Sequence, residues 1–151
     1  MSDTFPTMND RSSPAASANG DRAGLVVGLD LVQVRAIADS VAQFGDRFLE
    51  RIYTSAELTY CLCDHANAPQ RLAARFAAKE AVLKVLRRSD EPISWRSIEV
   101  AREPSGACSV LLFDEARALA DAAGFVRFSL SMTHEADYAG AVVIGERASA
   151  S

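Results

Sequence analysis

The chain has 151 residues, of which 49% are hydrophobic and 24% are charged, as in a single ordinary globular domain. Its formal net charge of −4 argues against general nucleic-acid binding, which requires a basic surface to meet phosphates. No apolar run is long enough to cross a bilayer, no secretory signal opens the sequence, and three cysteines do not suggest a disulfide framework. We therefore expect a cytoplasmic protein with no role in a membrane or on nucleic acid. A domain this small leaves much surface exposed, so an oligomer is also expected.

The first 22 residues differ in composition from the rest of the chain. Residues 1–22 are rich in small and polar residues and are predicted to be a disordered tail, which leaves 23–148 as the folded domain. That domain opens with a short, Val-rich apolar run at 25–32, which predicts a strand buried on both faces.

A helical region follows. Apolar residues at helical spacing between 37 and 52 predict two short helices that Gly45 separates. Thr54 and Glu57 have the spacing of a capping box, which predicts another helix start. Pro69 can open the longest helix, which is predicted to run to about residue 87.

Strands dominate the second half. Residues 93–100 and 107–113 are predicted strands, joined by a turn with Pro104 at its second position and Gly106 at its fourth. Asp114 is predicted to cap a helix that ends at Gly124, and a final hairpin pairs 126–134 with 138–145. Long antiparallel pairs beside separate helices predict a small single-domain α+β fold, with an antiparallel sheet packed on the long helix.

Asp30 stands out because it interrupts the most apolar run of the sequence. An unpaired carboxylate in such a strand would cost several kcal/mol or shift its pKa. A structural salt bridge, a metal ion and a catalytic role are all compatible with it.

The long helix carries a second unusual pattern. Arg71, Arg75 and Lys79 fall on one stripe at about 100° per residue, and Glu80 and Lys84 fall on the neighbouring stripe. A carboxylate beside several cations suits a divalent metal together with a polyphosphate. The alternative is a solvated helix face with i,i+4 pairs such as Glu80 with Lys84.

His134 ends a predicted strand on which Ser129, Ser131 and Thr133 alternate. A histidine beside hydroxyl groups can contact a phosphate or pantetheine. It can equally well pair with the acidic turn that follows.

Several segments, in order, resemble the holo-[acyl-carrier-protein] synthase family, the small trimeric type of 4′-phosphopantetheinyl transferase. Residues 27–32 (VGLDLV) are similar to the opening G-x-D motif, and 51–57 (RIYTSAE) to the next conserved segment. Residues 75–81 (RFAAKEA) match the most specific family signature, with Lys84 at the usual distance. The end of the chain, 130–134 (LSMTH) and 139–143 (AGAVV), follows in the expected order, so the resemblance spans about 25–147.

The resemblance implies an Mg2+-dependent enzyme that transfers 4′-phosphopantetheine from coenzyme A to a serine of an acyl carrier protein and releases 3′,5′-ADP. It implies that Asp30 and Glu80 bind Mg2+. The residues that would bind coenzyme A are Arg75, Lys79, Lys84, Gly106, Thr133 and His134. Glu80 and Lys84 would be catalytic, and the base that takes the serine proton would be Glu80, Lys84 or a water on the metal.

The resemblance further implies a homotrimer with the site between subunits, and an acidic carrier helix that docks on basic residues. Here Arg35, Arg47 and Arg51 are the candidates for docking. The family's Gly-Thr-Gly stretch is replaced by 87–92 (RRSDEP), and its N-G-x-P turn retains only Gly106. These departures favour an altered contact with the carrier or coenzyme A, in fatty-acid synthesis or in a specialised pathway such as polyketide biosynthesis. One alternative is a non-catalytic relative that only binds carrier protein or coenzyme A, and retention of Asp30, Glu80 and Lys84 argues against it. Another is a different Mg2+-dependent enzyme that acts on a nucleotide-linked substrate.

Overall fold

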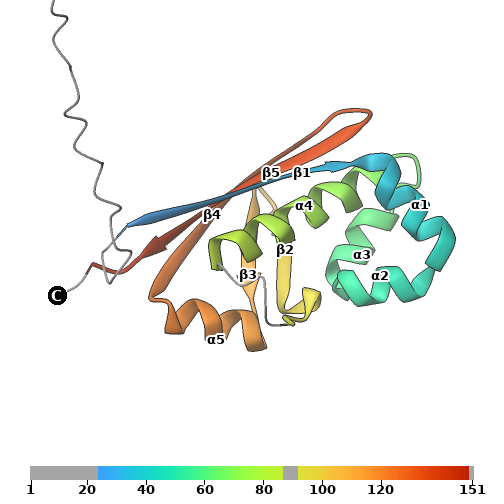
Figure 1. The fold of residues 1–151 in the computed structure, drawn as a ribbon. Coiled ribbons are helices and arrows are strands. Elements are labelled where there is room, and N and C mark those ends of the chain that lie inside the picture. Colours follow the sequence, from blue (N-terminus) through green and yellow to red (C-terminus); the bar gives the residue numbers. More distant parts are fainter. Residues whose placement is uncertain (1–23, 87–91, 150–151) are drawn as a thin grey trace, which may run out of the picture.

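A three-stranded antiparallel sheet, in the order β1-β5-β4, forms the long axis of the molecule (Figure 1). Its strands are β1 (Leu25–Gln33), β4 (Phe125–His134) and β5 (Tyr138–Arg147). The computed structural model describes residues 24–86 and 92–149, so the predicted tail at 1–22 lies outside the described residues. The predicted strand at 25–32 and the predicted C-terminal hairpin are both confirmed.

Helix α4 (Ala68–Leu86) lies along one face of this sheet and forms the centre of the core. Its alanines at 77, 78 and 81 are fully buried, and small side chains allow the helix to approach the strands closely. The contact is closest at Gly28 of β1, where a built Cβ would lie 2.1 Å from the carbonyl oxygen of Ala81. Glycine is therefore required there by the packing of helix on strand.

Three short helices gather at one end of α4 (Figure 1). They are α1 (Val34–Phe44), α2 (Asp46–Ile52) and α3 (Ser55–Leu62). Gly45 separates the first two with a φ of 55°, as its position predicted. The predicted capping box is present, since the Thr54 side chain accepts from the Glu57 N–H and the Glu57 carboxylate accepts from the Thr54 N–H.

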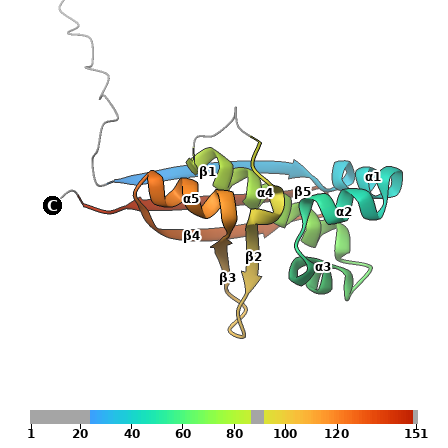
Figure 2. The same cartoon turned by 90° about the horizontal axis from the view of Figure 1, so that it is seen from below.

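A two-stranded hairpin, β2 (Ile98–Arg102) and β3 (Cys108–Leu112), projects from the body between α3 and α5 (Asp114–Ala122) (Figure 2). The predicted turn is confirmed by the Gly106 N–H, which donates to the Glu103 carbonyl at 2.8 Å. The strand predicted over 93–100 begins only at Ile98, because a 3₁₀ turn, η1 (Trp95–Ser97), precedes it. The prediction that Asp114 caps α5 is wrong: Phe113 holds the cap position, and Asp114 has a φ of 43°.

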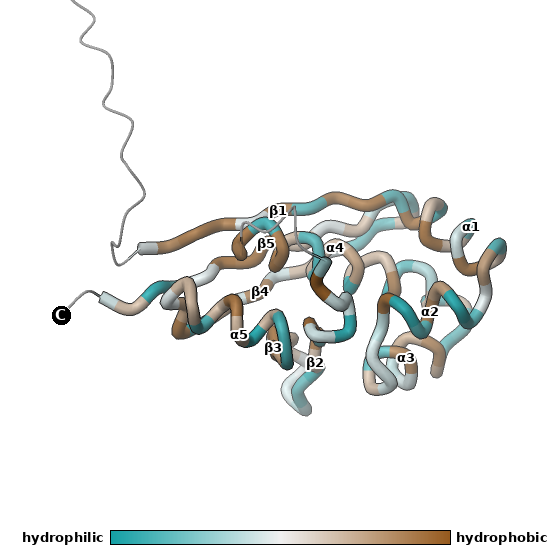
Figure 3. The backbone as a smooth tube through the Cα atoms, turned by 60° about the horizontal axis from the view of Figure 1, so that its bottom comes forward, coloured by the Kyte–Doolittle hydropathy of each residue, from teal (hydrophilic) through white to brown (hydrophobic). Residues whose placement is uncertain are grey.

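The outer face of the sheet differs from the prediction for the first strand. The first strand was predicted to be buried on both faces, but β1 lies at an edge of the sheet, and α4 covers only its inner face. The outward side chains Leu25, Val27, Leu29 and Leu31 are each 61–68% exposed. We call these four residues the outer apolar row, and Figure 3 shows that β1 is hydrophobic along much of its length. Among the described residues, no helix is both long enough and apolar enough to cross a membrane.

Candidate functional site

Asp30 meets α4 at the inner face of β1. The strand alternation that exposes Leu29 and Leu31 turns Asp30 inward, and its side chain is only 18% exposed. The Lys84 ammonium donates to the Asp30 carboxylate at 2.9 Å and to the Leu29 carbonyl at 2.7 Å. The salt bridge considered for Asp30 is therefore present, and its cation is one of the predicted site residues.

Glu80 lies one helical turn before Lys84 and faces the same strand. Burial raises the pKa of its carboxyl group, the charge of Asp30 raises the pKa further, and the Lys84 ammonium acts in the opposite direction. The carboxylates of Asp30 and Glu80 repel each other. A hard divalent cation bound to both would reduce that repulsion. Among the described residues, no group of three or more His, Cys, Asp or Glu side chains could hold a metal, so further ligands would have to come from the substrate or water.

Lys79, the neighbour of Glu80, points the opposite way, into the core. Its side chain is fully buried and its ammonium lies 2.8 Å from the Glu57 carboxylate. Burial lowers the pKa of the Lys79 ammonium, and the charge of Glu57 raises it. We expected Lys79 to lie near phosphates of coenzyme A, but the structure buries it in a network of protein groups.

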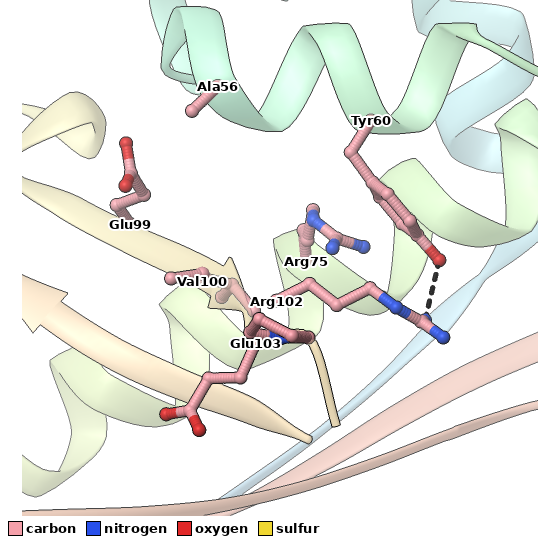
Figure 4. Close-up of a pocket in the computed structure, with 9 residues that line it drawn as sticks. Ala56, Tyr60, Arg75, Glu99, Val100, Arg102 and Glu103 are labelled. Atoms are coloured by element: carbon pink, nitrogen blue, oxygen red, sulfur yellow. Dashed lines mark hydrogen bonds between the residues drawn. The ribbon is translucent and has the colours of Figure 1, made fainter. Parts of the chain in front are cut away.

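Arg75 lines a pocket of about 610 Å³ between α3 and the β2–β3 hairpin (Figure 4). We call it the arginine pocket. The other residues that line it are Ala56, Tyr60, Glu99, Val100, Ala101, Arg102, Glu103 and Pro104. Arg75 is 3% exposed, its guanidinium lies 4.3 Å from the centre of the Tyr60 ring, and its Nε has no hydrogen-bond partner among the described residues. A buried guanidinium without a carboxylate partner suits an anionic ligand.

Arg102 reaches across the same pocket to Tyr60. Its guanidinium donates to the Tyr60 hydroxyl at 2.8 Å and lies 5.2 Å from the ring centre (Figure 4). Arg71 approaches the ring as well, at 4.8 Å. Three guanidinium groups therefore surround one tyrosine, and their mutual repulsion would be reduced by a bound phosphate.

A second pocket, of about 560 Å³, lies on the side of α4 where α2 and η1 meet. We call it the aromatic pocket, and it is lined by Phe44, Arg47, Phe48, Arg51, Ile52, Phe76 and Trp95. Phe76 and Trp95 stack with ring centres 5.0 Å apart. Arg47 and Arg51 at the edge of an apolar hollow suit an acidic partner with an exposed hydrophobic side chain.

Other predicted residues line neither of these two pockets, although Thr133 lines a further hollow of about 280 Å³ together with Asp30. Arg35 is exposed on α1, 3.7 Å from Asp39, and it does not line the aromatic pocket. Thr133 and His134 are exposed at the end of β4, and Gly106 lies at the turn of the β2–β3 hairpin. Within this one chain, the structure does not bring Thr133 or His134 into either pocket.

Sequence reasoning missed Tyr60, Arg102 and Trp95 as candidates for the two pockets. No local pattern marks Tyr60 or Arg102, because they come from α3 and β2 and meet only in the folded chain. Trp95 carried a weak signal, since it is the only tryptophan and follows a proline-containing loop.

The chain is similar to known proteins over nearly all of its described length. The 4′-phosphopantetheinyl transferase superfamily profile matches residues 26–143. The chain is 46% identical to the holo-[acyl-carrier-protein] synthase of Koribacter versatilis over 123 residues, which are 81% of this chain and 98% of the relative. It is 38% identical to the protein of the same name from Halothermothrix orenii, over 80% of this chain and 95% of the relative.

Solved structures give the same result for the fold. The Chronobacterium ammoniagenes ACPS–CoA complex matches with a TM-score of 0.74 and 28% identity, covering 83% of this chain and 98% of that one. The Helicobacter pylori holo-[acyl-carrier-protein] synthase in complex with coenzyme A matches with a TM-score of 0.69 and 29% identity, covering 80% and 99%. The expected α+β architecture is confirmed by these matches.

Proposed function

Because this chain belongs to the 4′-phosphopantetheinyl transferase superfamily, with holo-[acyl-carrier-protein] synthases as its relatives, we propose that it transfers 4′-phosphopantetheine from coenzyme A to a serine of an acyl carrier protein. The observation that supports this for the site is the Asp30–Glu80–Lys84 group, in which Lys84 pairs with Asp30 and the charges of both Asp30 and Lys84 act on Glu80. A protein that only binds a carrier has no use for two mutually repelling carboxylates.

The proposed cofactor is Mg2+, held by Asp30 and Glu80. The donor set fits: both groups supply carboxylate oxygen, which Mg2+ prefers. Burial raises the pKa of Glu80, and the charge of Asp30 raises it further, a repulsion that a cation would remove. When bound, Mg2+ would supply positive charge to the phosphates of coenzyme A. Two protein ligands leave room for phosphate oxygens and water around the ion.

In the transfer, the serine oxygen bonds to the β-phosphorus of coenzyme A, and the bond from that phosphorus to the bridging oxygen breaks. 3′,5′-ADP takes the electron pair, and the serine proton must pass to a base. The candidates for that base are Glu80, Lys84 and a water on the metal, and a protonated Lys84 would instead supply positive charge to the phosphates. Positioning and charge neutralisation provide most of the catalysis in this scheme.

The arginine pocket is the proposed site for the remaining phosphate charge of coenzyme A. The unpartnered Nε of Arg75 and the nearby Arg102 support this, and the turn at Gly106 borders the pocket through the hairpin. Lys79 is not part of this proposal, because its ammonium is already held by Glu57 in the core.

The aromatic pocket is the proposed docking site for the carrier. Arg47 and Arg51 would meet its acidic groups, and the hollow between Phe48 and Trp95 would receive an apolar side chain. Arg35 would extend this basic surface along α1, since its side chain is 90% exposed.

A homotrimer is proposed from the outer apolar row. Four large side chains exposed along one strand, beside the half-exposed Val142, are more apolar surface than an isolated small domain usually leaves to water. Ser131 and Thr133 lie on the same face of β4, so an interface there would bring Thr133 and His134 to a neighbouring subunit's site.

The proposed transfer can be tested by incubating the protein with an apo-carrier, coenzyme A and Mg2+ and measuring carrier mass. We expect a carrier heavier by one phosphopantetheine, and no product from Asp30→Ala or Glu80→Ala variants that remain folded by circular dichroism. Binding of coenzyme A without any product, across several carriers, would favour the non-catalytic relative instead. Full activity of Asp30→Ala would refute the metal assignment.

A further inference from the structure

The buried Lys79 ammonium connects α4 to three segments that are distant in sequence. It donates to the carbonyl of Ile52 at 2.9 Å, of Trp95 at 3.0 Å and of Ile98 at 2.6 Å. Ile52 ends α2, Trp95 begins η1 and Ile98 begins β2. With the Glu57 carboxylate as the fourth acceptor, the ammonium forms more hydrogen bonds than it has protons, so some of these contacts share a proton.

These partners build the walls of both pockets. Ile52 and Trp95 line the aromatic pocket. Glu57 accepts a further hydrogen bond, from the Val100 N–H at 2.8 Å, and Val100 lines the arginine pocket. One buried charge therefore fixes a wall of each pocket relative to α4.

Lys79 acts on the pockets without entering them. It lines neither pocket, and its side chain is 0% exposed. The contact between α4 and β1 has a separate basis, because Gly28 packs directly against the Ala81 backbone. The positions of Asp30 and Glu80 are thus set by helix–strand packing and not by the Lys79 network.

We infer that Lys79 is a positioning residue that holds the walls of the coenzyme A and carrier pockets in place on α4. The inference rests on the proposed function, since it assigns each pocket the ligand given above. Loss of Lys79 weakens binding of both substrates and leaves the metal pair intact.

The test compares steady-state transfer by the full-length wild type and Lys79→Met, with Mn2+ affinity measured separately by calorimetry. We expect KM to rise at least fivefold for both coenzyme A and the carrier, while kcat and the Mn2+ dissociation constant change less than threefold. The matched control is Arg117→Met, which removes a cation from an exposed pair with Asp121 on α5 and should leave every constant unchanged.

Three results with a folded variant would overturn the inference. A rise in KM for coenzyme A alone would indicate a direct phosphate contact. Unchanged KM values in a folded variant would make the network irrelevant to binding. A parallel loss of kcat and Mn2+ affinity would show that Lys79 supports the metal pair as well. Absence of transfer by the wild type would instead refute the proposed function.

Lys79→Met leaves Glu57 as a buried charge without its cation, and that variant can fail to fold. The double variant Lys79→Met/Glu57→Gln removes both charges and keeps the shape of the Glu57 side chain. We expect the same pattern of KM, kcat and Mn2+ affinity, because the three carbonyls still lose their donor. If both variants fail to fold, Lys79 serves stability alone and the inference is overturned.

Discussion

At the scale of single residues, the Glu80 carboxyl group lies where its own charge is disfavoured. Its pKa is raised in the folded protein by burial and by Asp30, so the folded state holds a proton that the unfolded state has already lost. Stability contributed by this group is present at low pH and is lost as pH rises from the ordinary glutamate pKa through the raised one. The proposed cation at Asp30 and Glu80 would offset this cost in the loaded enzyme.

Glu80→Gln should therefore stabilise the metal-free protein while abolishing transfer. The free energy of unfolding in chelator-treated buffer should rise by about 0.5 kcal/mol at pH 7, and the gain should shrink as pH falls. Denaturant titrations at pH 4.5 and pH 7 measure this, with the exposed Glu115→Gln on α5 as control. A gain that grows toward low pH would contradict the sign of the Glu80 shift.

Arg75→Gln tests the arginine pocket at the same scale. Because the Arg75 guanidinium is buried without a carboxylate partner, its removal costs the core little, while the pocket loses its main positive charge. We expect KM for coenzyme A to rise about tenfold or more, equivalent to about 1.4 kcal/mol, with KM for the carrier nearly unchanged. Equal effects on both substrates would argue against a phosphate site in this pocket.

At the scale of elements, the packing of α4 on β1 decides whether the carboxylates meet. Asp30 faces α4 because its neighbours Leu29 and Leu31 face outward, and Gly28 lets the helix come close enough for Lys84 to reach it. The site therefore depends on the alternation of side chains along β1 and on the glycine at position 28, which has no side chain to hold the helix away.

Gly28→Ala should destabilise the protein strongly. A Cβ placed 2.1 Å from the Ala81 carbonyl oxygen forces the helix and strand apart, and we expect a loss of about 3 kcal/mol. Gly140→Ala on the paired strand is the matched control, since its nearest contact would be 3.5 Å, and it should change stability by less than about 0.5 kcal/mol. Chemical denaturation measures both, and similar effects of the two would contradict the packing argument.

At the scale of the whole molecule, the outer apolar row and the two pockets lie on different surfaces. α4 runs along the inner face of the sheet, and α1, α2 and α3 lie at one end of it, so the proposed interface on the outer face would leave the aromatic pocket open to a partner. The net charge of −4 requires that attraction for an acidic carrier be local, as at Arg47 and Arg51.

Val27→Glu should dissociate the proposed trimer without unfolding the subunit. Val27 is 61% exposed in the single chain, so a charge there destabilises the isolated subunit little. In the proposed interface the same charge would be buried without a partner, which destabilises the trimer. We expect a monomer by light scattering and an unchanged circular dichroism spectrum. Leu111→Glu, a 40% exposed position on β3, is the control and should keep the wild-type mass; an unchanged mass of Val27→Glu would place the interface elsewhere.

Elements with a local signal were predicted well. The capping box at Thr54, the break at Gly45 and the turn ending at Gly106 follow from one or two residues each, and all are present. Asp114 failed as a cap because the backbone of Phe113 already takes that position. The strand predicted from residue 93 failed because periodicity cannot distinguish a 3₁₀ turn from a short strand.

The sequence by itself determined the family and the α+β class, and it singled out Asp30, Glu80 and Lys84 as candidates, because these depend on residue type and on spacing along the chain. Only the tertiary structure decided that Lys79 points into the core while its neighbour Glu80 faces the strand. It also decided that Tyr60 and Arg102 line the same pocket as Arg75, and that one face of β1 is exposed to solvent in the single chain. These features depend on which elements pack together, and such contacts between distant segments leave no local pattern in the sequence.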